Sequence, residues 1–162
     1  MLSIIVAIAE NYAIGKNGDL LCHLPADLKH FKETTSGKTV LMGERTFFSL
    51  PKHPLPNRRN VVLTDVTGKT FEGAESAYSI DELRAKVANE KEAFVIGGGM
   101  VYRQMMPLAD KLYITHIHHG WEDADTFFPE IKAEEWRLIS EERHEADEHN
   151  PYAFTFAEYI RK

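Results

Sequence analysis

The chain has 162 residues, of which 43% are apolar and 27% are charged, and its formal net charge is −6. A chain of this length buries roughly 69% of its unfolded surface, enough for one hydrophobic core, so we expect one domain over residues 1–162. The acidic balance argues against nucleic-acid binding, which needs a basic patch. The single cysteine, Cys22, excludes an intramolecular disulfide. No apolar stretch approaches the ~20 residues of a membrane span and no basic leader is present, so we expect a cytoplasmic protein without membrane contact.

The first part of the sequence alternates apolar strands with helices. Residues Leu2–Ala9 form a nearly unbroken apolar run, which is typical of a central strand covered on both faces. A flexible loop is expected from Asn11 to Gly18. A helix is expected over 25–35, because Pro25 suits a first helical position and Leu24, Leu28 and Phe31 form an apolar stripe. The next expected elements are a strand at Thr39–Met42, a helix at 44–50, a strand at Asn60–Thr64, a helix from Ser79 to about Asn89, a strand at Ala93–Ile96 and a helix at Val101–Met106 that Pro107 ends.

The last part of the sequence shows strands without helices. A strand is expected at Leu112–His118, and two more at Trp136–Arg143 and Tyr152–Ile160, with a polar loop at Ala146–Pro151 between them. Strands that alternate with helices predict a mostly parallel sheet, and a helix-free tail predicts an antiparallel edge. We therefore predict a three-layer α/β/α fold with a mixed, mostly parallel central sheet and an antiparallel C-terminal edge.

Three consecutive glycines, Gly97-Gly98-Gly99, follow an apolar strand and precede a helix. Glycines let a ligand approach the backbone closely, so the triplet indicates contact with a phosphate or a dinucleotide. The usual Gly-x-Gly-x-x-Gly fingerprint is not met, because Tyr102 stands where its last glycine would be. A plain strand-to-helix turn is the alternative.

Asp27 allows two interpretations. It can be an ordinary acidic residue in the first turn of a helix, where the helix dipole favours it. Its apolar neighbours Leu24, Leu28 and Phe31 favour a second interpretation, in which the carboxylate binds a cation or a flat heterocycle with two adjacent N–H donors.

Other polar residues carry weaker signals. Arg58 and Arg59 can form a solvated pair or an anion clamp. His116 and His118 share a strand face with His119 beside them, but no nearby Asp, Glu or Cys completes a ligand set, so we expect no metal site. Cys22 has no His-Asp arrangement beside it and is not expected to act as a nucleophile.

Several segments form, in this order, a pattern more specific than any one of them alone. They are residues 4–9 (IIVAIA), Ile14-Gly15, Leu24–Leu28, Val40–Gly43, Pro54–Arg58, Val95–Gly99 with Tyr102, Tyr113–His116 and Asp125–Pro129. This pattern covers essentially the whole chain and resembles the bacterial dihydrofolate reductases.

The resemblance implies an NADPH-dependent reduction of 7,8-dihydrofolate to 5,6,7,8-tetrahydrofolate, which supplies one-carbon metabolism. In that reaction, hydride moves from the nicotinamide C4 to the pterin C6, and a water delivers a proton to N5. The resemblance also implies a monomer that diaminopyrimidine or pteridine antifolates bind.

The resemblance further implies a role for individual residues. Asp27 would hold the pterin 2-amino group and N3, Thr115 would hydrogen-bond to both partners, and Tyr102 would lie beside the nicotinamide, with Leu20 and Cys22 in a loop that closes over it. Arg58 would bind the α-carboxylate of the glutamate tail. The other substrate-binding residues would be Ile5, Val6, Leu28, Phe31, Lys32, Leu50, Leu55 and Ile96. The cofactor-binding residues would be Ala7, Ile14, Gly15, Asn17, Gly18, Asp19, Leu20, Gly43, Glu44, Arg45, Thr46, Leu63, Thr64, Asp65, Ile96, Gly97, Gly98, Gly99, Met100, Val101, Tyr102 and Gln104.

Three positions depart from the family pattern. The family usually has a tryptophan in the segment where this chain has Leu20-Leu21-Cys22. The N–H of that tryptophan anchors an active-site water, and a thiol is a weaker donor. Glu44 stands where an arginine usually faces the cofactor 2′-phosphate, and Asp65 where a small hydroxyl residue lines the same site. Two like charges ~4 Å apart repel by about 4 kcal/mol at an effective dielectric near 20. Either both carboxylates turn outward and Arg45 takes over, or the preference for NADPH over NADH is relaxed; we expect NADPH use with a reduced margin.

Two alternatives stay open at this point. One is a reductase of another pterin- or pyrimidine-like heterocycle on the same fold, which would have no need of Arg58. The other is a non-catalytic nucleotide-binding module, in which Asp27 is only a charge at the start of a helix.

Overall fold

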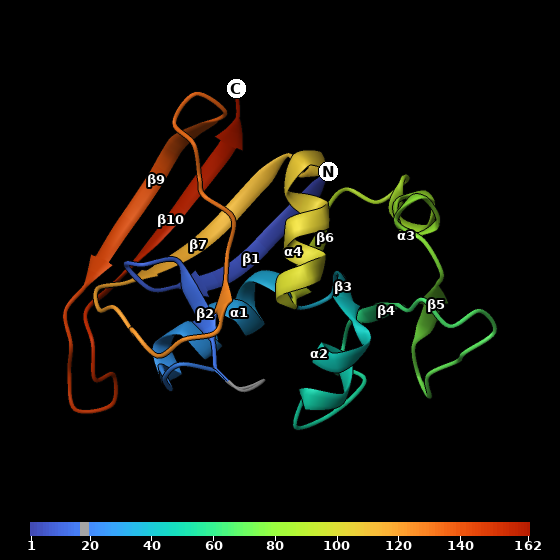
Figure 1. Cartoon of the computed structure of the whole chain (residues 1–162), viewed down its shortest axis with the longest axis horizontal. Coiled ribbons are helices and arrows are strands. Elements are labelled where there is room, and N and C mark those ends of the chain that lie inside the picture. The colour runs from blue at the N-terminus through green and yellow to red at the C-terminus, as the bar shows by residue number, and fades with distance from the viewer. Residues whose placement is uncertain (17–19) are drawn as a thin grey trace.

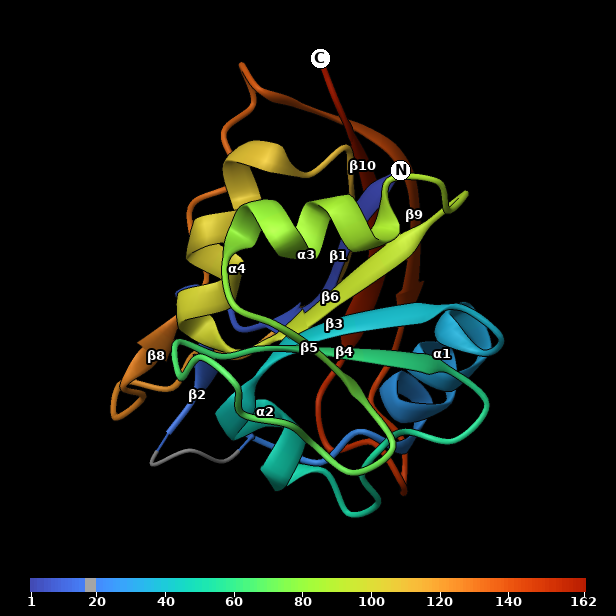
Figure 2. The ribbon, with the colours of Figure 1, turned by 90° about the vertical axis from the view of Figure 1, so that its right-hand side faces the viewer.

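The computed structural model describes residues 1–16 and 20–162. In these residues, one eight-stranded sheet has the order β5-β4-β3-β6-β1-β7-β10-β9 (Figure 1). Strands β2 and β8 form a separate two-stranded ribbon, and both are labelled in Figure 2. The strands of the large sheet are β1 (Leu2–Ile8), β3 (Thr39–Gly43), β4 (Arg59–Leu63), β5 (Glu75–Ala77), β6 (Ala93–Gly97), β7 (Lys111–Ile117), β9 (Trp136–His144) and β10 (Phe154–Arg161). The first six strands in this order, β5, β4, β3, β6, β1 and β7, run parallel to one another. Strand β10 is antiparallel to β7, and β9 is antiparallel to β10.

Helices cover both faces of this sheet. Figure 2 shows α3 (Ile80–Val87) and α4 (Gly99–Met105) on one side and α1 (Pro25–Thr35) and α2 (Glu44–Ser49) on the other. The three-layer α/β/α prediction and the antiparallel C-terminal edge are therefore confirmed. The last helix differs from expectation, because α4 begins at Gly99 and Pro107 lies within a short 3-10 turn at Met106–Leu108. Proline is compatible with the start of such a turn, since its missing N–H is not needed there.

Alternation along β1 divides the core in two. Ile4 and Ile8 face α3 and α4, where they pack in one buried cluster with Leu83 and Met105. Ile5 points to the opposite face and packs in a second cluster against α2. Burying each such apolar side chain contributes roughly 1.5–3 kcal/mol. Because β1 has apolar side chains on both faces, it is stable in the middle of the sheet, where both faces are covered.

The loop expected at 11–18 contains a short strand, which corrects the sequence prediction. β2 (Ala13–Gly15) pairs with β8 (Thr126–Phe127), and the amide of Phe128 donates to the carbonyl of Tyr12 over 2.8 Å. Strands this short show no hydrophobic periodicity, so their pairing depends on the distant partner segment. Asn17, Gly18 and Asp19, expected at the cofactor, lie outside the described residues.

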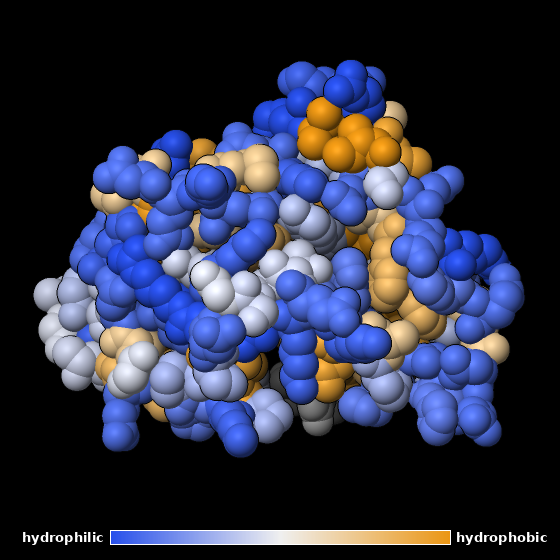
Figure 3. Space-filling view, turned by 180° about the vertical axis from the view of Figure 1, so that it is seen from behind, coloured by the Kyte–Doolittle hydropathy of each residue, from blue (hydrophilic) through white to orange (hydrophobic). Residues whose placement is uncertain are grey.

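The surface carries dispersed apolar side chains. Figure 3 shows mainly hydrophilic side chains on the back of the molecule, with apolar ones in separate patches. The large exposed apolar residues come from distant elements, such as Leu28 in α1, Met100 in α4 and Ile139 in β9. None of the helices in the described part of the chain has the length and apolar character of a membrane span.

Candidate active site

The carboxyl ends of β4, β3, β6, β1 and β7 lie side by side along one edge of the sheet. Neighbouring strands are about 4.8 Å apart, so this edge extends for about 19 Å. Thr64 follows β4, Glu44 follows β3, and Thr115 lies near the end of β7. Open α/β sheets bind their ligands outside this edge. Residues expected to bind the substrate, such as Thr115, and residues expected to bind the cofactor, such as Glu44 and Thr64, thus lie along the same edge of the sheet.

Asp27 lies in the first turn of α1 and contacts β7. Thr115 Oγ1 donates a hydrogen bond to Asp27 Oδ1 over 2.5 Å. Burial raises the pKa of Asp27 above its ordinary value, and the Thr115 hydrogen bond and the charge of His30 oppose this rise only in part. Burial, and then the charge of Asp27, also raise the pKa of the Cys22 thiol. A carboxylate in such an apolar setting favours a ligand that donates hydrogen bonds to it.

The glycine turn at residues 97–99 joins β6 to α4. The φ of Gly97 is 138°, a conformation that favours glycine, and the Gly97–Gly98 peptide bond is cis. A Cβ at Gly97 would lie 3.3 Å from Thr46 Oγ1 and 3.5 Å from the Tyr102 hydroxyl oxygen. Gly97 therefore has a structural reason to be glycine, whereas Gly98 is half-buried and presents bare backbone at this edge.

Tyr102 connects the glycine turn with the carboxylate. Its side chain is buried, and its hydroxyl donates to the carbonyl oxygen of Ile5 over 3.1 Å. Burial, and then the charge of Asp27, raise the pKa of Tyr102 beyond the usual range, so the hydroxyl stays protonated. Tyr102 thus lies among Ile5, Gly97 and Asp27, at the middle of the edge.

Apolar side chains line the edge between α1 and α2. Phe31, Leu50, Leu55 and Ile96 are half-buried and pack against the cluster that contains Ile5. Leu28, which the resemblance assigns to substrate binding, is 46% exposed. Val6 packs on the opposite face of the sheet, and Lys32 is exposed. Partly exposed apolar groups around a few polar ones are typical of sites for small ligands.

Arg58 and Arg59 separate in the structure. Arg59 binds Glu75 and Glu90 and therefore stabilises the opposite end of β4. Arg58 Nε donates to Thr35 Oγ1 over 2.8 Å, and its guanidinium carbon lies 5.9 Å from the centre of the Phe31 ring. Its Nη1 donates to a carbonyl oxygen, which leaves Nη2 without a protein partner in the described part of the chain. Of these two arginines, Arg58 is the one placed to bind an anion beside the apolar wall.

Glu44 does not turn outward, which was the first of the two alternatives expected from the sequence. Its Oε2 accepts a hydrogen bond from Thr64 Oγ1 over 2.9 Å, and its Oε1 forms an ion pair with Lys69. These two contacts lower the pKa of Glu44, Lys69 first. Arg45 and Asp65 are exposed. Sequence reasoning missed Lys69, because this residue lies in the loop between β4 and β5 and only the fold brings it to α2.

The remaining residues expected at the cofactor differ in their surroundings. Val101 is buried, and its Cγ2 would lie 3.1 Å from a Cβ at Gly43. Leu20 is 78% exposed and Met100 is 69% exposed. The structure places Ile14 and Gly15 in β2, Ala7 half-buried near Cys22, Leu63 half-buried at the end of β4, and Gln104 exposed on α4.

Asn150 is a residue that sequence reasoning missed. The residue before α1, Leu24, provides no side-chain cap, and Asn150 Oδ1 accepts the hydrogen bond of the Ala26 amide over 3.1 Å instead. Asp147 Oδ1 in turn accepts from the amide and the side-chain nitrogen of Asn150, over 2.7 and 3.0 Å. The loop between β9 and β10 therefore fixes the helix start that carries Asp27. The separation in sequence hides this partnership, although Asp-x-x-Asn is typical of a turn.

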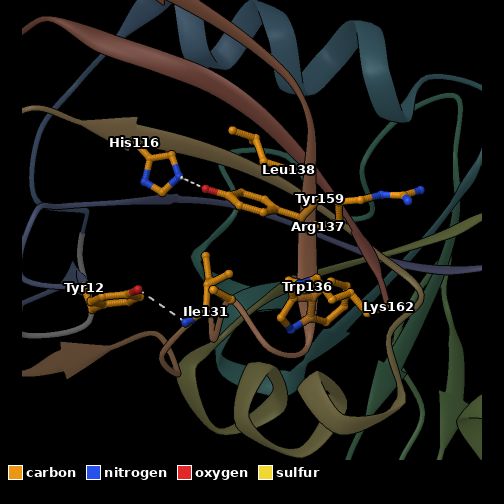
Figure 4. A pocket seen from close by; sticks show the side chains of 9 residues that line it. Tyr12, His116, Ile131, Trp136, Arg137, Leu138, Tyr159 and Lys162 are labelled. Carbon is orange, nitrogen blue, oxygen red and sulfur yellow. Dashed lines mark hydrogen bonds between the residues drawn. The ribbon is translucent and has the colours of Figure 1, made fainter.

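The histidines of β7 lie in a different region. His116 Nε2 hydrogen-bonds with the Tyr159 hydroxyl over 2.7 Å, and His118 Nε2 with Thr155 Oγ1 over 2.8 Å. Figure 4 shows His116 and Tyr159 at a cavity of about 360 Å³ that Tyr12 and Trp136 also line. Asp27 and Thr115 are not among its lining residues.

A half-buried carboxylate, a glycine turn and partly exposed apolar side chains along the carboxyl edge of a mostly parallel sheet are the features of an α/β protein that binds a nucleotide or another small ligand there. The family model for dihydrofolate reductase matches residues 1–161. The chain therefore belongs to the dihydrofolate reductase family.

Individual relatives match over the whole chain. Dihydrofolate reductase of Bacillus subtilis (strain 168) is 43% identical over 162 residues, which cover 100% of this chain and 95% of the relative. Dihydrofolate reductase type 3 of Salmonella typhimurium is also 43% identical over 162 residues, covering 100% of this chain and 99% of the relative. The solved structure of dihydrofolate reductase from Enterococcus faecalis complexed with NADP(H) and RAB-propyl matches with a TM-score of 0.92 and 39% identity, over 100% of this chain and 96% of that one.

Proposed function

We propose that the chain reduces 7,8-dihydrofolate to 5,6,7,8-tetrahydrofolate with NADPH, and that Asp27 binds the pterin. The observation that carries this proposal is the hydrogen bond from Thr115 to Asp27 in an apolar setting at the carboxyl edge of the sheet. Membership in the dihydrofolate reductase family supports the same reaction.

Asp27 and Thr115 supply the polar contacts for the pterin. Two adjacent N–H groups of a flat heterocycle match the two oxygens of one carboxylate. Thr115 uses its proton on Asp27, so its oxygen remains an acceptor for an amino group of the substrate. A negative charge held in a site of low polarity favours the protonated form of the bound ring and so assists the reduction.

The apolar wall and Arg58 account for the rest of the substrate. Phe31, Leu50 and Leu55 provide a surface for flat rings. Arg58 presents Nη2 next to Phe31, where a carboxylate of the glutamate tail can bind to it. This feature favours dihydrofolate over a heterocycle without an acidic tail. Diaminopyrimidine inhibitors offer the same paired N–H donors, so we expect them to bind at Asp27.

The same edge has the features that a dinucleotide needs. Bare backbone at Gly98, hydroxyls at Thr46 and Thr64 and the cation of Lys69 follow one another from β6 to β4. When bound, the reduced nicotinamide supplies the hydride for the reduction. Tyr102 and Gly97 would border that ring, and the buried Tyr102 hydroxyl keeps its proton there.

Cys22 distinguishes this chain from the usual family pattern. Burial and the charge of Asp27 keep its thiol protonated, so it does not act as a nucleophile. A thiol is a weak donor, so the water that delivers the proton to N5 is held less firmly than by an indole N–H. We include a cytoplasmic location in this proposal, because a free thiol stays reduced there.

The reaction can be tested by following the loss of NADPH absorbance at about 340 nm with dihydrofolate. We expect ready turnover by the parent and a fall in kcat/KM of about tenfold or more in Asp27→Asn at neutral pH. Asp81→Asn is the matched control, because Asp81 lies in the first turn of α3. Unchanged activity in Asp27→Asn would remove the carboxylate from the mechanism. Binding of NADP⁺ without turnover by the parent would favour the non-catalytic alternative.

A further inference from the structure

Glu44, Thr64 and Lys69 form a polar cluster at the β4 end of the carboxyl edge. The carboxylate of Glu44 accepts a hydrogen bond from Thr64 over 2.9 Å and forms an ion pair with Lys69. The side chains of Glu44 and Lys69 are both partly exposed, so a ligand at the edge can reach them. A cation and an anion thus meet at one point of the surface.

The backbone of Lys69 is held firmly in place. Its carbonyl oxygen accepts hydrogen bonds from Ser76 Oγ over 2.8 Å and from the Tyr78 hydroxyl over 3.0 Å. Its amide donates to the carbonyl of Val66 over 3.1 Å, and the amide of Val66 donates to Thr64 Oγ1 over 3.2 Å. The loop between β4 and β5 therefore fixes the backbone position of Lys69, while its side chain is partly exposed beside Glu44.

The position of this cluster relates it to the far end of a dinucleotide. Three strand spacings separate β1 from β4, a distance of about 14 Å along the edge. A cofactor with its nicotinamide beside Tyr102 and its diphosphate across the turn at Gly98 extends its adenosine ribose toward β3 and β4. At that ribose NADPH carries a 2′-phosphate and NADH carries a 2′-hydroxyl.

Recognition of the two cofactors follows from opposite charges. In dinucleotide sites, an acidic side chain accepts hydrogen bonds from ribose hydroxyls, whereas a cation accommodates the 2′-phosphate. This chain has an acidic and a basic side chain at the same place, Glu44 and Lys69, and the two form an ion pair with each other. The ion pair places Lys69 at this point, whereas Arg45 is exposed and forms no ion pair within residues 1–16 and 20–162.

We propose that the Glu44–Lys69 pair sets the choice of cofactor: Lys69 binds the 2′-phosphate of NADPH, whereas Glu44 repels that phosphate and accepts a hydrogen bond from the 2′-hydroxyl of NADH. NADPH must draw Lys69 away from Glu44, but NADH leaves the pair intact. The preference for NADPH is therefore smaller than a site with cations alone would give. This inference rests on the proposed function, since it concerns the same cofactor site.

Binding measurements can test the roles of both residues without turnover. We would measure the Kd of NADP⁺, NAD⁺ and adenosine 2′,5′-bisphosphate by calorimetry for the parent, Lys69→Gln and Glu44→Gln. Lys69→Gln should weaken NADP⁺ and the bisphosphate about tenfold or more and change NAD⁺ less than about threefold. Glu44→Gln should tighten NADP⁺ about fivefold or more and weaken NAD⁺.

Two further variants separate charge recognition from folding. Lys69→Arg should retain NADP⁺ binding within about threefold of the parent, because it keeps the cation. Lys38→Gln removes a lysine that pairs with Glu92 at the opposite edge of the sheet, and it should change neither Kd. Equal weakening of NADP⁺ and NAD⁺ in Lys69→Gln, or no effect of Glu44→Gln, would overturn the proposal. So would a parent kcat/KM preference for NADPH on the order of several thousandfold.

The outcome can be distinguished from the fate of the proposed function. If Lys69 controls NADP⁺ binding but the parent does not reduce dihydrofolate, the inference stands and the proposed reaction fails. If dihydrofolate is reduced but the two substitutions leave both Kd values unchanged, the reaction stands and the inference fails.

Discussion

The two ends of the carboxyl edge each hold a carboxylate, and the surroundings of the two carboxylates shift their pKa values in opposite directions. At the β7 end, Asp27 is a carboxylate in an apolar setting, with Thr115 as its hydroxyl donor, and burial raises its pKa. At the β4 end, Glu44 is a half-exposed carboxylate that Lys69 and Thr64 neutralise, so its pKa is lowered. A carboxylate kept short of partners is prepared for a ligand, whereas one with a cation beside it must exchange that partner when a ligand arrives. Under the proposed function, the difference separates the end that binds the pterin from the end that we infer selects the cofactor.

The largest effect that we expect is on substrate binding beside the apolar wall, where Arg58 lies. We expect Arg58→Gln to raise the KM for dihydrofolate by about 10- to 100-fold, because a hydrogen bond to a charged group contributes about 1.5–3 kcal/mol. The kcat should change little, since Arg58 lies away from the reacting ring. Steady-state kinetics would measure both constants. Arg59→Gln is the control, because its guanidinium binds Glu75 and Glu90 instead.

A substrate without the glutamate tail completes this test. A dihydropteridine of that kind should show the same KM with the parent and with Arg58→Gln. If Arg58→Gln raises the KM for both substrates equally, Arg58 acts by supporting the fold through Thr35 and not by binding the glutamate tail.

A smaller effect is expected at the start of α1. Asn150→Ala removes the only cap that the described residues provide for the Ala26 amide, and loss of a helix cap costs about 1 kcal/mol. The Tm should fall by about 2–4 °C in a domain of this size. Since Asp27 follows Ala26, kcat/KM for dihydrofolate should fall and its pH profile should shift, while the Kd of NADP⁺ stays constant.

Asn89→Ala provides the matched control for this loss, since Asn89 is exposed beyond the end of α3. A fall in Tm with an unchanged pH profile would show that Asn150 stabilises the fold without positioning Asp27. Equal weakening of NADP⁺ would mean that the cap serves both ends of the edge.

The smallest effects have opposite signs at the two carboxylates. A raised folded-state pKa means that the contribution of Asp27 to stability is full below about 3.9, its usual unfolded value, and is lost as pH rises through the folded pKa. Asp27→Asn should therefore raise Tm at neutral pH by about 2 °C, and this gain should disappear near pH 4. Thermal unfolding at both pH values would measure it. A lower Tm for Asp27→Asn at neutral pH would contradict the burial argument.

Glu44 should behave in the reverse way. Its lowered pKa gives stability that is present above about 4.3, the usual unfolded value, and is lost as pH falls through the folded pKa. Glu44→Gln should thus lower Tm slightly at neutral pH and have no effect in acid. The same unfolding series checks this, and a rise in Tm at neutral pH would show that the ion pair with Lys69 does not stabilise the fold.

Local patterns in the sequence were enough to predict the main elements and to single out Asp27 as a candidate site residue. The apolar run at the N-terminus predicted β1, and Pro25 with its apolar neighbours predicted α1 within the observed bounds. Asp27 was identifiable because a charge among apolar residues at the start of a helix needs an explanation. The family pattern then related it to Thr115, which the structure brings within hydrogen-bonding distance.

The rest depended on partners that are distant in sequence. Lys69 reaches Glu44 from a loop 25 residues further along, and Asn150 reaches Ala26 from 124 residues further along. No local pattern encodes such pairs, because the intervening strands decide which loops meet. The ribbon of β2 and β8 was missed for the same reason. Charge arithmetic identified the conflict at Glu44, but its resolution required the position of Lys69.

The place of β10 in the sheet also affects how the enzyme is made. This strand lies between β7 and β9, pairs Phe156 with Thr115, and follows directly after the loop of Asn150. A nascent chain whose Asn150 and β10 are still inside the ribosome therefore lacks both the neighbour of Thr115 and the cap above Asp27. We therefore expect products of synthesis that is interrupted before β10 to bind dihydrofolate poorly, even when Asp27 and Thr115 have both been made.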